Sequence, residues 1–208
     1  VAADGDPIGY AADKSGNGRH MTQATTVNKP TYKASVQNGL GVARTDGTDC
    51  LRNDGIASLV AGDNAPLSVV VAFGTSQLSP IANGLYAVSD GTSSTLHRLR
   101  WGDSVNVFRR SSGVTRLATA TGTTGAHILV DVFAGTRWLY QGHTEVVSGF
   151  DASTPSAPFT KFVIGAAQDN GEFLQGDMFE FLLFARQLTR DERIALVTYL
   201  AEKWGITP

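Results

Sequence analysis

The stretch GDMFEFLLFARQLTRDERIALVTYLAEKWGI, residues 176–206, decides the fold that we predict for this chain. Its first part, residues 177–184, is aromatic and aliphatic, which favours a β-strand. Thr189 and Glu192 then have the spacing of a helix capping box. Because Gly205 stands where a C-cap glycine is expected, we predict a helix between the capping box and this glycine.

The predicted helix has one apolar face, formed by residues at helical spacing: Ile194, Val197, Leu200, Ala201 and Trp204. In the strand before it, Phe179, Phe181 and Leu183 alternate with other residues, and we expect these side chains and the helix face to lie in the core. Nothing in the stretch activates a nucleophile. It therefore carries information about the fold and none about catalysis.

Upstream of this stretch, the sequence predicts strands every 10–15 residues with turns between them. LSVVVAF, residues 67–73, is the clearest buried strand because it is apolar and has three β-branched valines at its centre. Two hairpins are predicted, one turning at residues 102–103 and one at residues 134–135. This spacing predicts an all-β protein, an antiparallel jelly-roll β-sandwich with one C-terminal helix, in a single domain over residues 1–208.

Composition excludes several function classes. Charged residues make up 17% of the chain and the formal net charge is −2, so we expect no nucleic-acid partner. No apolar run is long enough for a transmembrane helix, and we expect no membrane insertion. Cys50 is the single cysteine, so an internal disulfide cannot form. The acidic start, VAADGDPIGY, is no signal peptide, and we expect the chain to be the C-terminal part of a longer protein.

Four segments carry a resemblance to a known family: DKSGNGRHMTQAT (13–25), TDGTDCL (45–51), FVIGA (162–166) and the C-terminal stretch. In this order they resemble the laminin-G-like branch of the concanavalin A-like lectin/glucanase superfamily. The versions they are most similar to occur in phage or prophage structural proteins and bacterial surface proteins. The resemblance implies two packed antiparallel sheets, a place on an extracellular or virion surface, and a homo-oligomeric assembly. It also implies binding of carbohydrate or of a protein surface.

Catalysis is not expected. Hydrolases of this superfamily place carboxylates on one strand in a pattern like E-x-D-x-x-E, and none of the five glutamates sits in such a pattern. A lyase would need a Tyr/His/Arg cluster. Tyr86, His97 and Arg98 would supply the residue types, but no spacing supports the cluster. We therefore predict no catalytic residues.

The first candidate binding site is the arginine-rich hairpin that turns at residues 102–103. Arg98 and Arg100 share one face of its first strand, and His97 and Trp101 share the other. An exposed indole stacks on a sugar ring, and arginine forks bind carboxylates, which suits an acidic polysaccharide. The alternative is that Trp101 is core and the arginines coat a solvated sheet. The candidates are His97, Arg98, Arg100, Trp101, Asp103 and Arg109.

A second candidate lies on the next hairpin. Ile128, Val130 and Val132 form an apolar face that we expect to point inward, which leaves the opposite face outward, on a binding groove or as ordinary sheet surface. Leu129 and Phe133 also fall on that outward face. The candidates are His127, Asp131, Trp138 and Tyr140.

No cofactor is required by the sequence, but the family resemblance implies that a structural calcium ion is possible. Residues 13–24 do not form an EF-hand, because Ala24 stands where a bidentate glutamate is needed. Asp46, Asp49 and Asp169 are the candidate calcium ligands, although no spacing singles them out.

These observations lead us to predict a non-catalytic carbohydrate-binding or adhesion module that recognises a surface glycan, as in a phage spike or fibre receptor-binding domain. Multiple copies would strengthen weak single sites. One alternative is a structural or decoration module of a virion or cell surface without glycan binding. A third reading is a polysaccharide depolymerase.

Overall fold

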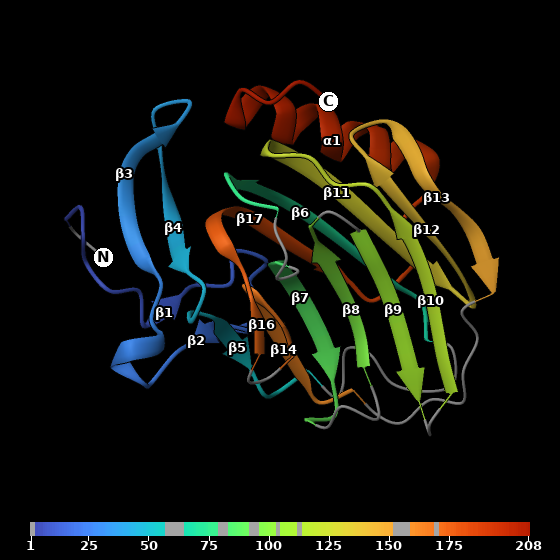
Figure 1. The fold of residues 1–208 in the computed structure, drawn as a ribbon, viewed down its shortest axis with the longest axis horizontal. Coiled ribbons are helices and arrows are strands. Elements are labelled where there is room, and N and C mark those ends of the chain that lie inside the picture. The colour runs from blue at the N-terminus through green and yellow to red at the C-terminus, as the bar shows by residue number, and fades with distance from the viewer. Residues whose placement is uncertain are drawn as a thin grey trace.

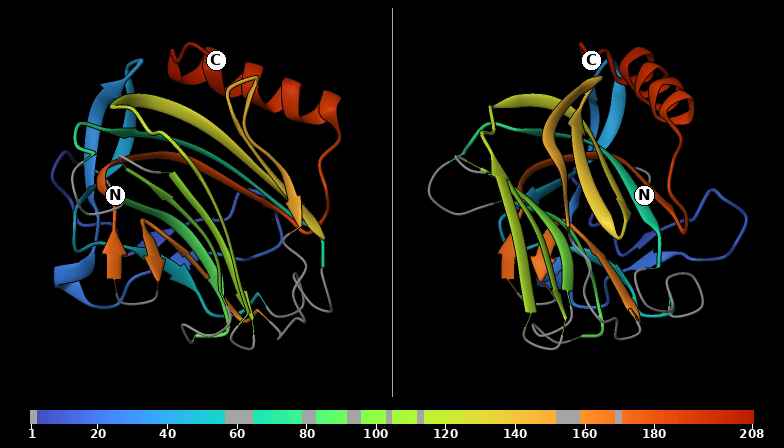
Figure 2. Two further views of the ribbon diagram at one scale, coloured as in Figure 1. Left: turned by 45° about the vertical axis from the view of Figure 1, so that its right-hand side comes forward. Right: turned by 90° about the vertical axis from the view of Figure 1, so that its right-hand side faces the viewer.

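The structure is a computed structural model that describes residues 3–56, 65–78, 83–91, 96–102, 105–111, 114–151, 159–168 and 171–208. In this part of the chain, two β-sheets pack face to face, and a single α-helix lies on the outer side of one of them (Figures 1 and 2). The predicted all-β jelly-roll sandwich with one C-terminal helix is therefore confirmed.

One sheet has seven strands and carries the helix. Its order is β13-β12-β11-β6-β17-β4-β3, and its neighbouring strands are antiparallel. The bounds are β3 (Thr31–Gln37), β4 (Leu40–Asp46), β6 (Leu67–Thr75), β11 (Gly125–Ala134), β12 (Thr136–Gln141), β13 (Thr144–Asp151) and β17 (Gln175–Phe184).

The other sheet has ten strands, eight of them in the order β1-β2-β5-β14-β7-β8-β9-β10. A small hairpin, β15–β16, joins it through β7. The bounds are β1 (Tyr10–Ala11), β2 (Met21–Thr22), β5 (Leu51–Asn53), β7 (Asn83–Ser89), β8 (Leu96–Trp101), β9 (Val105–Ser111), β10 (Val114–Ala120), β14 (Lys161–Ile164), β15 (Ala166–Gln168) and β16 (Gly171–Phe173). A 3₁₀ turn, η1 (Thr26–Asn28), precedes β3.

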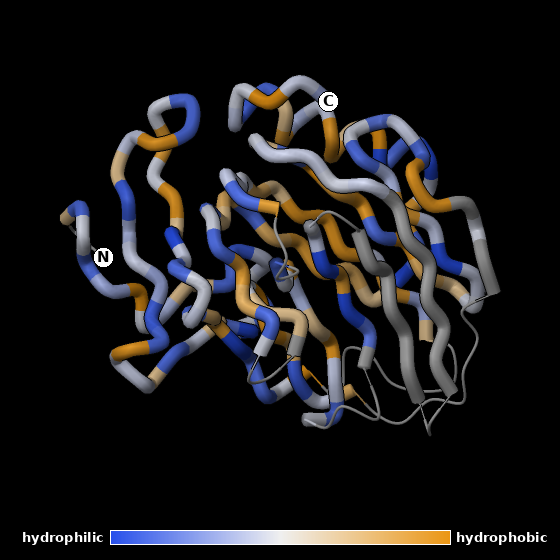
Figure 3. Tube along the Cα trace, viewed as in Figure 1, coloured by the Kyte–Doolittle hydropathy of each residue, from blue (hydrophilic) through white to orange (hydrophobic). Residues whose placement is uncertain are grey.

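The central strands of the seven-stranded sheet are buried on both faces. In β6, Val69, Val71 and Phe73 face the ten-stranded sheet, whereas Val70 and Ala72 face the helix. This explains why residues 67–73 form an apolar run without polar alternation. Figure 3 shows the same trend, with hydrophobic segments gathered on the strands in the middle of the molecule.

The helix α1 (Arg190–Trp204) begins and ends as predicted. Thr189 caps its N-terminus, and the reciprocal capping box with Glu192 is present. Gly205 closes the C-terminus in the left-handed conformation, with φ of 62°. Trp204 is buried and stacks on Phe179, with the ring centroids 5.1 Å apart. The predicted apolar helix face therefore packs on the sheet.

A β-bulge in β17 separates two layers of the core. The register with β6 shifts between Met178 and Glu180, so Phe179 is the extra residue. Phe179 consequently lies on the helix side, whereas Phe181 packs against the core between the sheets. The three side chains expected in the core are partly buried and pack against it, with Phe179 in the layer under the helix and Phe181 and Leu183 in the layer between the sheets.

The β15–β16 hairpin covers part of the outer face of the ten-stranded sheet. β16 pairs with β7 in parallel through Phe173 and Gly84, the one departure from the predicted antiparallel pairing among the described strands. A Cβ atom at Gly84 would overlap backbone atoms of Ala167 and Glu172. The absence of a side chain at Gly84 therefore allows the hairpin to lie directly on the sheet.

Both predicted hairpins are present. β8 and β9 are antiparallel neighbours on either side of residues 102–104, and β11 pairs with β12 around Gly135. Within the described residues, no helix has both the length and the apolar character that crossing a membrane requires.

Candidate functional site

Strand β11 has no outward face, contrary to prediction. Ile128, Val130 and Val132 pack against the helix side, as part of an apolar cluster that includes Val197 and Leu200. The opposite face, with Leu129 and Phe133, packs into the core between the sheets. The reason is the position of β11 next to β6 in the middle of a sheet that is covered on both sides.

Asp131 consequently lies in the interior, in what we call the buried charge cluster: Tyr86, His97, Asp131 and Arg137. Arg137 Nε donates to Asp131 Oδ1 at 2.8 Å, and the Tyr86 hydroxyl donates to Oδ2. His97 Nε2 lies 3.5 Å from the same carboxylate. All four side chains are at most 1% exposed. The cluster is therefore closed to ligands, and the predicted glycan contacts at His97 and Asp131 lack the exposure they need.

The Asp131 carboxylate is stabilised by its neighbours in this cluster. Burial disfavours the carboxylate, but Arg137 and His97 together outweigh that penalty and hold the pKa of Asp131 below its usual range. Burial, followed by the negative charge of Asp131, raises the pKa of Tyr86. The carboxylate is thus stabilised by the Arg137 guanidinium, the His97 ring and the Tyr86 hydroxyl, as a buried ion pair requires.

Trp101 belongs to the core. Its side chain is 0% exposed, its indole N–H donates to the Thr123 carbonyl at 2.8 Å, and its ring meets Phe73 edge-on at 5.6 Å. The prediction that this indole stacks on a sugar required an exposed ring, so the alternative, a core tryptophan, describes the structure.

Trp138 and Tyr140 pack on the helix side of β12 and are half-buried. The Arg193 guanidinium of α1 lies over the Tyr140 ring, 3.6 Å from its centroid. Because the helix covers this face, the two rings do not line the predicted groove with His127 and Asp131.

The two arginines of β8 lie on the opposite face from His97 and Trp101, as the strand alternation predicts. Arg98 Nη1 donates to Glu172 Oε2, and Arg100 Nη1 donates to Glu172 Oε1, both at 2.5 Å. We call these three residues the arginine clasp. Glu172 comes from the β15–β16 hairpin, more than 70 positions away, and no signal in the sequence connected it to β8.

Three predicted residues cannot be placed by their side chains. Asp103 and Asp169 lie outside the described residues. Arg109 belongs to β9, where its backbone is paired with His97, and its side chain also lies outside the described part.

Asp46 and Asp49 lie together in the turn after β4. Asp46 accepts hydrogen bonds from the backbone and hydroxyl of Thr48, while Asp49 Oδ2 accepts from the Asp46 N–H at 3.1 Å. Burial raises the pKa of Asp49 to about 6. Among the described residues, no three His, Cys, Asp or Glu side chains gather as a metal site would require, so the calcium ion stays a prediction.

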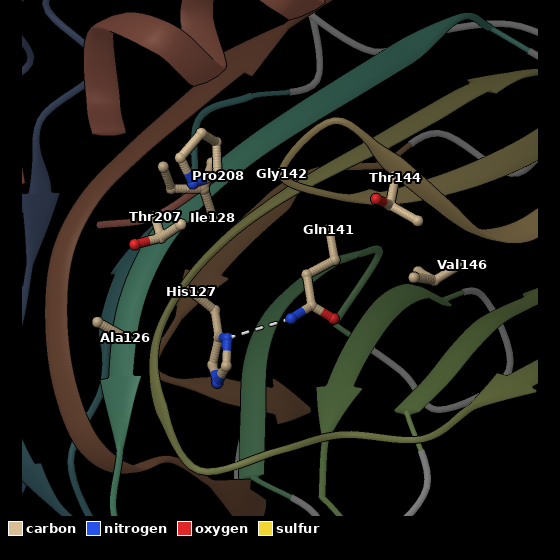
Figure 4. A pocket seen from close by; sticks show the side chains of 9 residues that line it. All are labelled: Ala126, His127, Ile128, Gln141, Gly142, Thr144, Val146, Thr207 and Pro208. Atoms are coloured by element: carbon tan, nitrogen blue, oxygen red, sulfur yellow. Dashed lines mark hydrogen bonds between the residues drawn. The ribbon is translucent and has the colours of Figure 1, made fainter. Parts of the chain in front are cut away.

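A surface pocket of about 270 Å³ contains the remaining candidate, His127. We call it the His127 pocket. Figure 4 shows His127 and Gln141 side by side, with Thr144 and Val146 to one side and Thr207 and Pro208 to the other. The lining comes from the start of β11, the β12–β13 turn and the segment after α1. A side chain at Gly142 would overlap Pro208, so a glycine here lets that last segment close the wall.

Inside the pocket, the imidazole is held in one orientation. His127 Nε2 lies 2.9 Å from the Thr123 carbonyl and therefore carries the proton, and Nδ1 accepts from the Gln141 amide at 3.3 Å. Burial lowers the pKa of His127, so the ring is neutral at pH 7. Within the described part of the chain, the Gln141 Oε1 atom and the hydroxyls of Thr144 and Thr207 have no hydrogen-bond partner. Sequence reasoning missed these three groups.

Comparison with solved structures supports the fold. The chain is similar to a GH54 α-L-arabinofuranosidase soaked with 4-nitrophenyl α-L-arabinofuranoside (TM-score 0.69, 13% identity, 95% of this chain and 51% of that chain). It is also similar to domain 4 of AbnA, a GH43 extracellular arabinanase from Geobacillus stearothermophilus, in complex with arabinotriose (TM-score 0.65, 15% identity, 94% of this chain and 100% of that chain).

A third similar structure is the Ruminococcus gnavus IT-sialidase CBM40 bound to α2,3-sialyllactose (TM-score 0.56, 12% identity, 68% of this chain and 85% of that chain). The chain spans only 26% of NanB, another similar protein, and about half of the arabinofuranosidase. At these identities the likeness is one of fold. The sequence matches no protein-family model and no curated protein.

Proposed function

We propose that this chain is a non-catalytic glycan-binding domain and that the His127 pocket takes one neutral sugar ring of a surface polysaccharide. The observation that carries the proposal is that the lining of the pocket includes three hydrogen-bonding groups without partners among the described residues, on Gln141, Thr144 and Thr207. Similar folds crystallised with arabinotriose and sialyllactose support the choice of ligand class.

The chemistry of the pocket suits sugar hydroxyls. Gln141 Oε1 accepts a hydrogen bond, and the two threonine hydroxyls both donate and accept, which matches the pattern of a polyol. Ile128, Val146 and Pro208 supply apolar surface for the C–H face of the ring. The volume of about 270 Å³ lies just below the roughly 300–1,000 Å³ of sites for drug-sized ligands, so one ring fits better than an oligosaccharide.

We propose binding without hydrolysis because the described residues that line the pocket include no Asp or Glu side chain. Glycoside hydrolysis uses two carboxyl groups that flank the scissile bond. The setting that we propose is an extracellular or virion surface, in a laminin-G-like module of a phage spike, fibre or bacterial surface protein. Several copies in one assembly would convert weak single sites into firm attachment.

The test is a glycan array followed by calorimetry on the strongest neutral ligand, with the Thr144→Val and Gln141→Leu variants. Thr144→Val removes one hydroxyl, and Gln141→Leu removes the side-chain amide together with its hydrogen bond to His127. Both variants nearly keep the size of the side chain. We expect each to weaken binding about fivefold, which corresponds to one net hydrogen bond of about 1 kcal/mol. Thr198→Val, at an exposed position of α1, is the matched control and should leave affinity unchanged.

Two outcomes would overturn the proposal. If the domain binds no neutral glycan, it is better described as a structural or decoration module. If incubation with the polysaccharide yields shortened or unsaturated products, the domain is a depolymerase and the proposed absence of catalysis is wrong.

A further inference from the structure

We infer that the arginine clasp is a second binding site, specific for the carboxylate of an acidic glycan, and that Glu172 occupies this site as an internal stand-in for the ligand. The inference rests on the proposed function in one respect only, namely that the natural ligand is a glycan. It concerns the outer face of the ten-stranded sheet and uses none of the residues of the His127 pocket.

The geometry already is that of carboxylate recognition. The two oxygens of Glu172 each accept from a different guanidinium, at 2.5 Å, so one carboxylate is held between Arg98 and Arg100. Charge-assisted contacts of this kind are the strong form of hydrogen bond and the reason that arginine is used to bind carboxylates. Any carboxylate that reaches the same position would make the same two contacts.

Both guanidinium groups of the clasp donate to the same carboxylate. Burial and the positive charge of Arg100 lower the pKa of Arg98, while Glu172 opposes them. Within the described residues, Arg100 Nε is buried without a hydrogen-bond acceptor. A second anionic or hydroxyl-bearing group would therefore be stabilised here.

Glu172 is a replaceable occupant. Its backbone adopts φ of 55°, a left-handed conformation that non-glycine residues seldom adopt. Its side chain is 26% exposed and that of Arg100 is 22% exposed, so the site opens to solvent. A ligand carboxylate would compete with a tethered one, whose effective concentration is in the millimolar range for a short connection. Affinity in the unmodified protein is consequently weak.

The experiment titrates trigalacturonate into the protein at low and physiological salt, with neutral galactotriose as the reference ligand. Glu172→Gln removes the competing charge and keeps the shape of the side chain. We expect this variant to bind trigalacturonate about tenfold more tightly than the unmodified protein, and Arg100→Gln to abolish binding in both backgrounds. Binding should weaken as salt is added, because the contact is between charges.

If Glu172→Gln fails to fold, Glu172→Asp replaces it. The shorter side chain reaches the two guanidinium groups less well, and a gain of about threefold is expected. No gain in a folded Glu172 variant overturns the inference. The two proposals can fail independently. Thr144→Val should leave trigalacturonate binding unchanged, and Arg100→Gln should leave binding at the His127 pocket unchanged.

Discussion

Two arginine–carboxylate groups lie back to back across β8 and differ in almost every physical respect. His97 points into the buried charge cluster, and its neighbour Arg98 points into the arginine clasp. The first group is sealed from water and pairs one carboxylate with one guanidinium. The second is partly exposed and sets one carboxylate against two guanidinium groups. The difference teaches that exposure, rather than residue type, separates a structural ion pair from a candidate binding site.

The free-energy cost of burying a charge explains why the two groups differ. An unpaired charge in the core is expensive, so a buried pair must be complete. Near the surface, water and salt screen the charges, so an ion pair there is worth less and its carboxylate can exchange with that of a ligand. Arg137 links the two groups, because its Nη2 donates to the Arg98 carbonyl at 3.0 Å.

The largest effect is expected from Arg137→Met, which leaves Asp131 buried without its cation. We expect the free energy of unfolding to fall by about 3–5 kcal/mol, as measured by urea denaturation. Arg100→Gln, in the clasp, should cost less than about 1 kcal/mol. Combining Arg137→Met with Asp131→Leu should restore part of the loss, because no lone charge then remains in the core. Equal losses at the two arginines would contradict the comparison.

A smaller effect is expected from Gly84→Ala, which disturbs the clasp without changing a charge. The new methyl group would overlap the backbone of Ala167 and Glu172, so the β15–β16 hairpin must move off the sheet. We expect a loss of about 1–3 kcal/mol, the usual range for overpacking, and altered amide chemical shifts over residues 166–173. The buried charge cluster should be undisturbed. Unchanged shifts in the hairpin would show that it does not depend on this contact.

The smallest effect concerns Asp49, a buried carboxyl group that sharpens the comparison because its hydrogen bond comes from a backbone N–H rather than from an arginine. Its pKa of about 6 lies above the unfolded value of about 3.9, so the folded state holds the proton more tightly. The free energy of unfolding should therefore fall as pH rises from about 4 to about 6, by about 1–2 kcal/mol.

Asp49→Asn should remove this pH dependence, which denaturation at a series of pH values will show. Calcium offers the opposite test. If Asp46 and Asp49 hold the predicted ion, millimolar calcium chloride will raise the melting temperature of the unmodified protein and leave that of Asp49→Asn unchanged. A melting temperature that calcium does not move would dispose of the predicted site.

Local signals predicted most of the fold. The capping box of Thr189 and Glu192, the glycine after the helix and the hairpin turns all involve residues within a few positions of each other. What the sequence did not reveal was which faces are covered. Strand β11 is covered by the helix on one face and by the ten-stranded sheet on the other, so its polar residue Asp131 lies in the interior. The apolar residues Leu129 and Phe133 on the same face as Asp131 were the sequence signal that this face is buried.

Prediction of the sites was poorer, for a physical reason. Alternation along one strand correctly put Arg98 and Arg100 on one face, but the acid that joins them arrives from a distant hairpin. The His127 pocket is likewise assembled from three segments that are far apart in sequence. Pairings of this kind depend on the tertiary fold, and no pattern of residue spacing encodes them.

The bulge in β17 determines how the end of the helix is anchored to the sheet. Because Phe179 and Glu180 both face the helix, Glu180 accepts from the Trp204 indole at 3.0 Å and from the Lys203 ammonium group at 2.7 Å. Deleting Phe179 would remove the bulge and restore regular pairing with β6, and the helix would lose the ring on which Trp204 stacks. The extra residue in β17 thus helps to fix the end of the helix on the sheet. Through the helix, it also positions the segment after α1 that lines the His127 pocket.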